Sequence, residues 1–241
     1  VRHWGYATDP EAMARKLQRN RSLLERSISD EPDEPFHHYS LAKQYLWEHE
    51  HLSALSEVRQ AIDLWTAQGM PAYGYVGPMF AVAACSALNL GQNDVVLALE
   101  TECPPSMVSS DLLYYAGIAC QRVGQPAAAI VRLTRAATDP GVRQATETDP
   151  ATATWQPRLL MAQLYNQIGE REEAYRWAVE AVDLMPDRGD ILLGGARLAM
   201  QMGHPEDAAR ICQRVLASQL DEAAKLNAQN LLLELGQAVP S

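Results

Sequence analysis

The chain has 241 residues, of which 47% are hydrophobic and 21% are charged, so it can bury a core as one large domain or two small ones. Its 30 acidic residues outnumber 20 basic ones. The resulting formal charge of −10 argues against a nucleic-acid binder, because phosphate contacts need clustered Lys and Arg. The longest nearly apolar run, Met79–Cys85, is far shorter than the ~20 residues of a transmembrane helix. The four cysteines form no CxxC pair, so we expect reduced thiols and a cytoplasmic protein.

Residues 1–32 predict a junction segment followed by a basic amphipathic helix. The string Asp9-Pro10-Glu11 is typical of a helix start, since it supplies an N-cap acid, a proline at the first helical position and an acid in the first turn. Apolar residues then recur at helical spacing, at Met13, Leu17, Leu24 and Ile28. Five basic residues crowd the rest of the helix, namely Arg15, Lys16, Arg19, Arg21 and Arg26. We expect the apolar stripe to pack on the helices that follow; contact with a membrane surface is the alternative.

The pattern that predicts two antiparallel helices is clearest in residues 155–188. Ala162 in the first helix and Ala174 in the second are small enough to let the two helices approach closely at their crossing point. Gly169 is expected to end the first helix because glycine tolerates positive φ, and Pro186 is expected to stop the second. This pattern resembles the tetratricopeptide repeat, a 34-residue helix–turn–helix unit. The resemblance implies an all-α, right-handed solenoid.

The same landmarks recur along residues 33–218, which we interpret as a tetratricopeptide-repeat domain of about five helix–turn–helix units. The units are expected at 35–68, 77–107, 110–143, 155–188 and 189–218. Uneven spacing predicts insertions at 69–75 and 144–150, which we expect to be surface loops, with a binding role as the alternative. Residues 219–241 predict a capping helix and tail, which a solenoid needs to cover its end.

The start of the chain carries a second and more particular resemblance. The string His3-Trp4-Gly5-Tyr6 is followed by the basic helix and then by Pro32–Phe36, in the order found where bacterial family-2 glycosyltransferases join a tetratricopeptide extension. The similarity covers about residues 1–66 and implies that a nucleotide-sugar-dependent transferase domain precedes Val1. It also implies that the divalent metal and the nucleotide sugar belong to that upstream domain, where His3 is the position that could complete the metal shell.

No catalytic centre and no metal site are predicted within these residues. Four histidines cluster in the sequence, at His37, His38, His49 and His51. His37 and His49 would lie about 18 Å apart along one helix and could not share an ion. We therefore expect a surface turn, and we find neither a glycine-rich phosphate loop nor a nucleophile motif. No cofactor is expected in the chain itself.

In this repeat architecture the first helix of each unit lines the concave face through its second, fifth, ninth and twelfth positions. These positions predict a peptide-binding groove made of Phe36, Tyr39, Lys43, Leu46, Tyr114, Gln121, Gln163, Asn166 and Arg197, with Asp190 at a further such position. The mixture suits an extended peptide, because amides can bond its backbone while aromatic rings cover apolar side chains. Chaperone-binding relatives hold a carboxylate with a Lys in the slot that Tyr39 occupies here, so that class of partner is not favoured.

The functional hypothesis is a protein–protein interaction or assembly module. We expect it to be the non-catalytic repeat region of a glycosyltransferase, holding an acceptor protein or pairing two subunits. The alternative is a stand-alone adaptor without an enzymatic domain. A homodimer contact is also expected through the last helix, because adjacent residues are about 100° apart and its leucines cannot share one face. These are Leu231, Leu232, Leu233 and Leu235.

Overall fold

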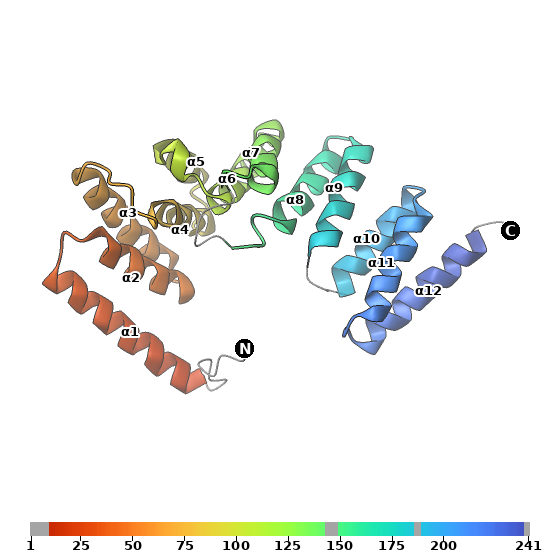
Figure 1. Ribbon diagram of the computed structural model, residues 1–241, viewed down its shortest axis with the longest axis horizontal. Helices are drawn as coiled ribbons and strands as arrows, with labels where there is room; N and C mark the ends of the chain where they lie inside the picture. Colours follow the sequence, from red (N-terminus) through yellow and green to blue (C-terminus); the bar gives the residue numbers. More distant parts are fainter. Residues whose placement is uncertain (1–9, 143–148, 186–188, 239–241) are drawn as a thin grey trace. The chain divides into compact units, whose positions relative to one another are not determined.

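Helices make up the regular structure of the chain. The computed structural model describes residues 10–142, 149–185 and 189–238, and these contain twelve α-helices, one 3-10 helix and no strand (Figure 1). The first elements are α1 (Pro10–Asp30), α2 (Pro35–Trp47), α3 (His51–Ala67), α4 (Val76–Asn89), α5 (Asn93–Glu102), η1 (Pro105–Met107) and α6 (Ser110–Arg122). They are followed by α7 (Pro126–Thr138), α8 (Trp155–Gln167), α9 (Arg171–Leu184), α10 (Gly189–Gln201), α11 (Pro205–Ala217) and α12 (Glu222–Ala238). The prediction of an all-α fold is confirmed.

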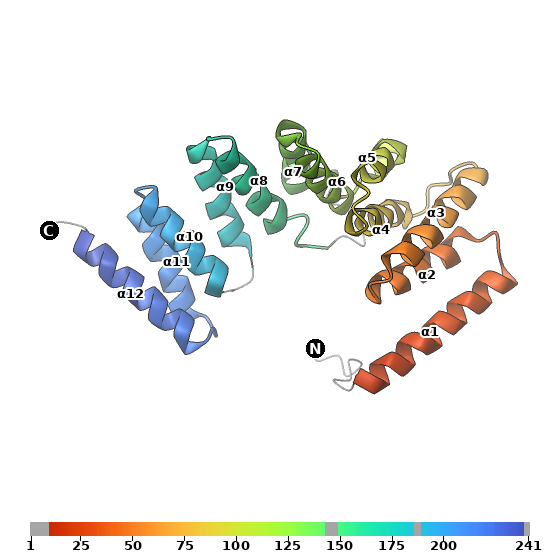
Figure 2. The same cartoon turned by 180° about the vertical axis from the view of Figure 1, so that it is seen from behind.

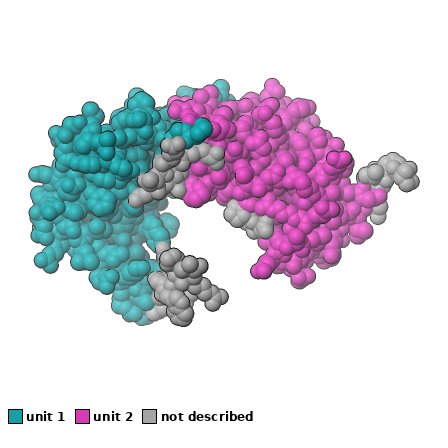
Figure 3. All heavy atoms as spheres, in the orientation of Figure 1, with its two compact units in different colours: residues 1–129, 140–148 teal, residues 130–139, 149–241 magenta. Residues whose placement is uncertain are grey.

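The chain divides into two compact units (Figure 3). Unit 1 consists of residues 1–129 and 140–148, and unit 2 of residues 130–139 and 149–241. Helix α7 therefore begins in unit 1 and continues in unit 2. The division of the sequence into a junction, a repeat domain and a cap stays a prediction.

The turn inside each helix pair has one repeated backbone geometry. Three residues separate the two helices of a pair, and the middle one has positive φ. Glycine occupies this place in four pairs, with φ between 74° and 87°, at Gly91, Gly124, Gly169 and Gly203. In the α2–α3 pair the place is taken by His49, with φ of 60°. The predicted role of Gly169 is thus confirmed, since a residue without Cβ adopts this conformation at the least cost.

Unit 1 has a core of aromatic and aliphatic side chains. Trp65 of α3 and Phe80 of α4 are almost fully buried and meet edge to face, with ring centroids 6.0 Å apart. Helix α1 lies against α2 (Figures 1 and 2), and its four stripe residues are partly buried, as expected. Arg21 of α1 fixes this contact by pairing with Glu50 at 2.6 Å, and its guanidinium carbon lies 4.6 Å from the ring centroid of Tyr45.

Unit 2 buries aliphatic residues between α10, α11 and α12. Leu192 and Ile211 are at most 1% exposed, and α12 adds Leu231 to the same cluster. The leucines of α12 divide as its helical geometry requires. Leu231 and Leu235 are buried and Leu232 packs beside the core, whereas Leu233 is 65% exposed. The packing of Leu231, Leu232 and Leu235 within unit 2 accounts for most of the leucine run, and the dimer contact stays a prediction.

The sequence also predicts reduced thiols and no membrane-spanning helix. All four cysteines are free thiols. Burial raises the pKa of Cys103 to about 12, so this thiol stays neutral at physiological pH. No helix in the described ranges has both the length and the apolar composition needed to cross a membrane.

Candidate functional site

The residues predicted to form one groove lie in several different environments. In α2, Phe36 is 46% exposed, Leu46 is partly buried, and the Nζ atom of Lys43 lies 5.1 Å from the ring centroid of Tyr39. Tyr39 itself is only 1% exposed, because the ring of Tyr75 stacks on it at a centroid distance of 5.6 Å. We therefore correct the placement of Tyr39, which is a core residue and offers almost no surface to a partner.

The other predicted groove residues are spread over both units. Tyr114 and Gln121 of α6 are partly buried in unit 1. Arg197 of α10 is exposed in unit 2 and lines a hollow of about 340 Å³ between α10 and α12. Gln163 and Asn166 of α8 share a different and larger hollow. The structure thus brings the predicted groove residues together in two separate places, around the ring of Tyr39 in α2 and at Gln163 and Asn166 in α8.

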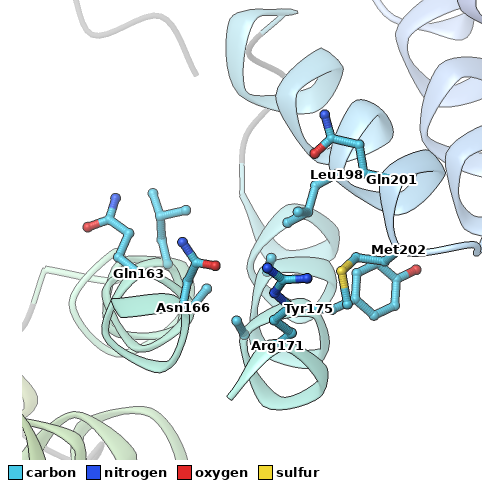
Figure 4. Close-up of a pocket in the computed structure, with 11 residues that line it drawn as sticks. Gln163, Asn166, Arg171, Tyr175, Leu198, Gln201 and Met202 are labelled. Atoms are coloured by element: carbon cyan, nitrogen blue, oxygen red, sulfur yellow. The ribbon is translucent and has the colours of Figure 1, made fainter. Parts of the chain in front are cut away.

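The larger hollow, of about 510 Å³, lies between α8, α9 and α10 in unit 2 (Figure 4). Its labelled side chains in Figure 4 come from α8 (Gln163, Asn166), from α9 (Arg171, Tyr175), and from the end of α10 and the turn after it (Leu198, Gln201, Met202). Small residues form part of its wall, namely Ala162, Ala174 and Ala178. The alanines that permit close helix packing thus also leave room for an occupant. We call this site the Arg171 hollow.

The polar groups of the Arg171 hollow are open to an incoming ligand. The side-chain amides of Gln163, Asn166 and Gln201 are exposed and form no hydrogen bond with another described residue. Arg171 is the one charged side chain among the eleven described residues that line the hollow, and no described carboxylate pairs with it. The hollow therefore combines amide donors and acceptors with a single positive charge.

Tyr175 supplies a fixed aromatic wall to the same hollow. Its ring stacks on His204, with centroids 4.2 Å apart and planes 7° from parallel. Its hydroxyl donates a hydrogen bond of 2.5 Å to Asp207, and this bond, helped by Arg210, lowers the pKa of the Asp207 carboxyl. Burial, followed by the bond to Asp207, raises the pKa of Tyr175 well above its usual value. The phenol is therefore neutral, and its ring is held in place by its hydroxyl.

Sequence reasoning missed most of the lining of this hollow. The position rule selected Gln163 and Asn166 but considered only first helices, so it passed over Arg171 and Tyr175, which lie one turn apart at the start of α9. A signal for these two was present in the fixed spacing after Gly169, because the second helix of each pair begins two residues after the residue with positive φ.

Two of the four clustered histidines contact carboxylates of neighbouring segments. His38 lies 2.8 Å from Glu57 of α3 through Nδ1, and His37 lies 3.1 Å from Glu31. Within the described ranges, no group of three or more His, Cys, Asp or Glu side chains is placed to hold a metal ion. Some predictions concern residues outside what is described: His3, the side chain of Asp190, Pro186, and residues 144–148 of the second expected insertion.

Comparisons with known proteins find similarity at the level of structure. No family model and no curated protein matches the sequence. PilF of Pseudomonas aeruginosa is similar over 92% of this chain and 92% of its own, with a TM-score of 0.61 at 15% identity. YrrB, described as a TPR protein with an unusual peptide-binding site, is similar over 86% of this chain and 97% of its own, with a TM-score of 0.51 at 16% identity.

A third similar structure is a chain of the APC/C hetero-tetramer Cut9–Hcn1, with a TM-score of 0.60 at 16% identity. It matches 91% of this chain, and this chain spans only 40% of its length. Together with the repeated helix pairs, these likenesses show that the fold is an all-α tetratricopeptide-repeat solenoid, as predicted.

Proposed function

We propose that the chain is a protein-interaction module that binds an extended peptide segment of its partner in the Arg171 hollow. The segment would place an apolar side chain in the hollow and a carboxylate beside Arg171. The observation that carries this proposal is the set of unpartnered polar groups: three amides and one guanidinium around a partly apolar space of about 510 Å³.

The chemistry of the hollow fits an extended peptide better than a compact small molecule. An extended backbone presents N–H and C=O groups at regular intervals, and a side-chain amide can both donate to and accept from them. Leu198, Met202 and the ring of Tyr175 offer apolar contact area. A carboxylate is favoured over a cation because Arg171 is the only charge in the described lining, and charge-assisted bonds to carboxylates are strong.

A peptide array tests this assignment and does not require the partner to be identified first. The probes are acetylated peptides that carry one glutamate and one leucine at varied spacing, with matched sets in which lysine replaces glutamate or alanine replaces leucine. We expect the purified chain to bind members of the glutamate–leucine set. The Arg171→Ala variant should bind them about tenfold more weakly, because one charge-assisted bond is lost.

A matched control lies on the same helix. Arg176 of α9 is exposed, lies outside the hollow and pairs with Glu173 at 2.6 Å, so Arg176→Ala removes an equal charge elsewhere. This variant should bind the peptides as the unmodified chain does. Equal binding of the lysine set, or equal losses in the two variants, would show that the hollow is not the site.

We further propose that the module serves a glycosyltransferase. This rests on the ordered motifs of residues 3–45 and on the packing of α1 against α2, which fixes the end of the junction to the repeats. The divalent metal and nucleotide sugar would be held by a domain upstream of Val1, and the repeats would hold the acceptor protein. A stand-alone adaptor without an enzyme is supported about as well.

The coding sequence upstream of Val1 separates these two alternatives. An Asp-x-Asp element after an apolar, strand-like run would support the transferase, whereas a start codon immediately before Val1 would contradict it. In either case the purified chain alone should transfer no sugar and hydrolyse no nucleotide sugar. Turnover that copurifies with the chain through further fractionation would overturn that expectation.

A further inference from the structure

Residues 69–75, which the spacing of the repeats predicts to be an inserted surface loop, form a loop in unit 1 that is tied down by hydrogen bonds. The indole Nε1 of Trp65 donates to the carbonyl of Pro71 at 2.8 Å. The amide of Gln68, just before the loop, donates to the carbonyl of Asp33 at 2.9 Å and so brings the linker between α1 and α2 beside the same corner. A loop held at both its start and its middle presents its side chains in a defined arrangement.

This loop completes a stack of aromatic rings. Tyr73 stacks on Tyr75, with centroids 5.2 Å apart and planes 15° from parallel, and Tyr75 stacks in turn on the buried Tyr39 at 5.6 Å and 13°. Phe36 meets Tyr75 edge to face at 5.2 Å. The outer members remain open, since Tyr73 is 38% exposed and Phe36 is 46% exposed. We call this set of four rings the aromatic stack.

Tyr73 also lines a hollow of about 340 Å³ in unit 1. Its other walls are small or apolar and include Gly74, Gly77, Pro78 and Val108. No charged side chain belongs to the described lining. We call this site the Tyr73 hollow; it offers a tyrosine ring and a smooth apolar surface instead of the amides and charge of the Arg171 hollow.

The surroundings of the aromatic stack are acidic. The linker beside the loop carries three acidic residues, Glu31, Asp33 and Glu34. Glu31 is 71% exposed and lies 3.1 Å from His37, and Glu34 accepts a hydrogen bond from the backbone N–H of Phe36. Lys43 lies at the inner end of the stack, over Tyr39. Burial, with a contribution from Glu34, raises the pKa of Tyr75 to about 12, so its phenol is neutral at physiological pH. The rim next to the exposed rings therefore favours a cationic partner.

We infer that the Tyr73 hollow binds a proline-containing extended segment that also carries a basic residue. Proline presents a flat apolar ring that covers an aromatic face, and proline-rich chains are already extended, so little conformational entropy is lost on docking. The acidic linker supplies the counter-charge for Arg or Lys. This surface lies in unit 1 and goes beyond the proposed function, because it selects a different class of peptide from the Arg171 hollow.

Other occupants fit the surroundings less well. A phosphate or an acidic peptide would find no cation in the described lining of the hollow, and the linker held beside the same loop carries three carboxylates that would repel it. A sugar ring could also cover the face of Tyr73, but the lining offers few polar side chains to orient its hydroxyls, with Ser106 as the exception. The proline-containing peptide is therefore the expected occupant, and binding of a sugar would contradict it.

Titration of the full chain with defined probes tests this inference. The first probe is acetyl-Pro-Pro-Ala-Pro-Pro-Arg-amide; matched probes replace every proline by glycine or the arginine by glutamate, and cellopentaose serves as the sugar. We expect the Pro–Arg peptide to bind, the glutamate version to bind several-fold more weakly, and the glycine version and cellopentaose to show no saturable binding.

Substitutions of Tyr73 test whether the peptide binds at this residue. Tyr73→Ala should weaken the Pro–Arg peptide at least about tenfold, whereas Tyr73→Phe keeps the ring and should stay within about threefold. Trp47→Ala removes another exposed aromatic, 63% exposed and outside this hollow, and should change nothing. Arg171→Ala should also leave this peptide unaffected, so failure of the Arg171 site and failure of this one are distinguishable.

Three results would overturn the inference. Equal binding of the glycine peptide would mean that proline is not recognised, and saturable binding of cellopentaose without the peptide would make the surface a sugar platform. Unchanged binding by Tyr73→Ala would place the peptide elsewhere. A far-ultraviolet circular dichroism spectrum equal to that of the unmodified chain shows that a variant is folded. If Tyr73→Ala does not fold, Tyr73→Phe keeps the test valid.

Discussion

The two hollows show how one repeat architecture produces two kinds of surface. The Arg171 hollow lies among regular repeat positions, where alanines leave space and exposed amides and an arginine surround it. The Tyr73 hollow depends on an insertion, whose tyrosines stack on a core residue of the first repeat. Regular positions thus supply polar groups in unit 2, while an irregular loop supplies aromatic rings in unit 1.

The two hollows should respond differently to amino-acid substitutions. The Arg171 hollow is walled by three separate helices, so a single surface substitution should alter its chemistry without altering its shape. The Tyr73 hollow depends on close contact between α4 and the η1 segment, where Gly77 meets the backbone of Met107. A substitution at that contact should disturb shape and stability together.

The largest expected effect is at Gly77. A Cβ atom at this position would lie 2.5 Å from the carbonyl oxygen of Met107, which is backbone and cannot rotate away. We expect Gly77→Ala to lower the free energy of unfolding by about 2–3 kcal/mol through overpacking. Thermal melting checks this, and the Pro–Arg peptide should bind this variant more weakly.

Gly74 provides the matched control, because a Cβ atom there would meet nothing within 4 Å. Gly74→Ala should change stability by less than about 0.5 kcal/mol. If the two alanine variants melt together, the close approach of η1 to α4 is not a feature of the molecule in solution.

A smaller effect is expected at the wall of the Arg171 hollow. Tyr175→Phe keeps the ring but removes the donor to Asp207, so we expect a loss of about 1.5 kcal/mol in the free energy of unfolding. Tyr165→Phe on α8 is the control, since that hydroxyl has no described hydrogen-bond partner. Urea unfolding at neutral pH measures both, and equal losses would contradict the role of the Tyr175 hydroxyl.

The same bond predicts a dependence on pH with a definite sign. The pKa of Asp207 is lowered from 3.8 in the folded chain, so the stabilisation it provides is complete above its unfolded pKa and is lost as the pH falls through the folded pKa. The difference in stability between the unmodified chain and Tyr175→Phe should therefore be constant above about pH 5 and shrink towards pH 3. A difference that grows on acidification would show that the hydrogen bond is not to the ionised carboxylate.

Structural features that repeat along the chain could be predicted from the sequence, whereas features that occur once could not. Helix pairs could be predicted because Gly169, Ala162 and Ala174 mark a turn and a crossing by their own size and backbone preference. The burial of Tyr39 could not, because the ring that covers it, Tyr75, belongs to a loop whose path no repeat specifies. The aromatic stack depends on tertiary bonds, such as that from Trp65 to Pro71, which spacing along the chain does not reveal.

The lining residues of the Arg171 hollow fall into the same two groups. Gln163 and Asn166 could be selected because they occupy regular positions on one helix. Leu198 and Met202 could not, because they reach the hollow only through the packing of the next helix pair against α9. Residues on one element follow from periodicity, and residues brought from another element follow only from the fold.

The smallest expected effect sharpens the comparison between the first repeat and the others at their shared turn. His49 takes the positive-φ position, with φ of 60°, that glycine occupies in the other four helix pairs. A side chain with Cβ is strained there by about 1 kcal/mol, so His49→Gly should raise the free energy of unfolding by about that amount.

His49→Ala separates backbone strain from loss of the imidazole, since it keeps Cβ and also removes the contact with His51, whose ring centroid is 6.2 Å away. We expect no gain from the alanine variant. Urea midpoints at unchanged slope measure both changes. If alanine and glycine stabilise equally, the imidazole and not the backbone was the unfavourable group, and the five turns would differ by side chain instead of by conformational strain.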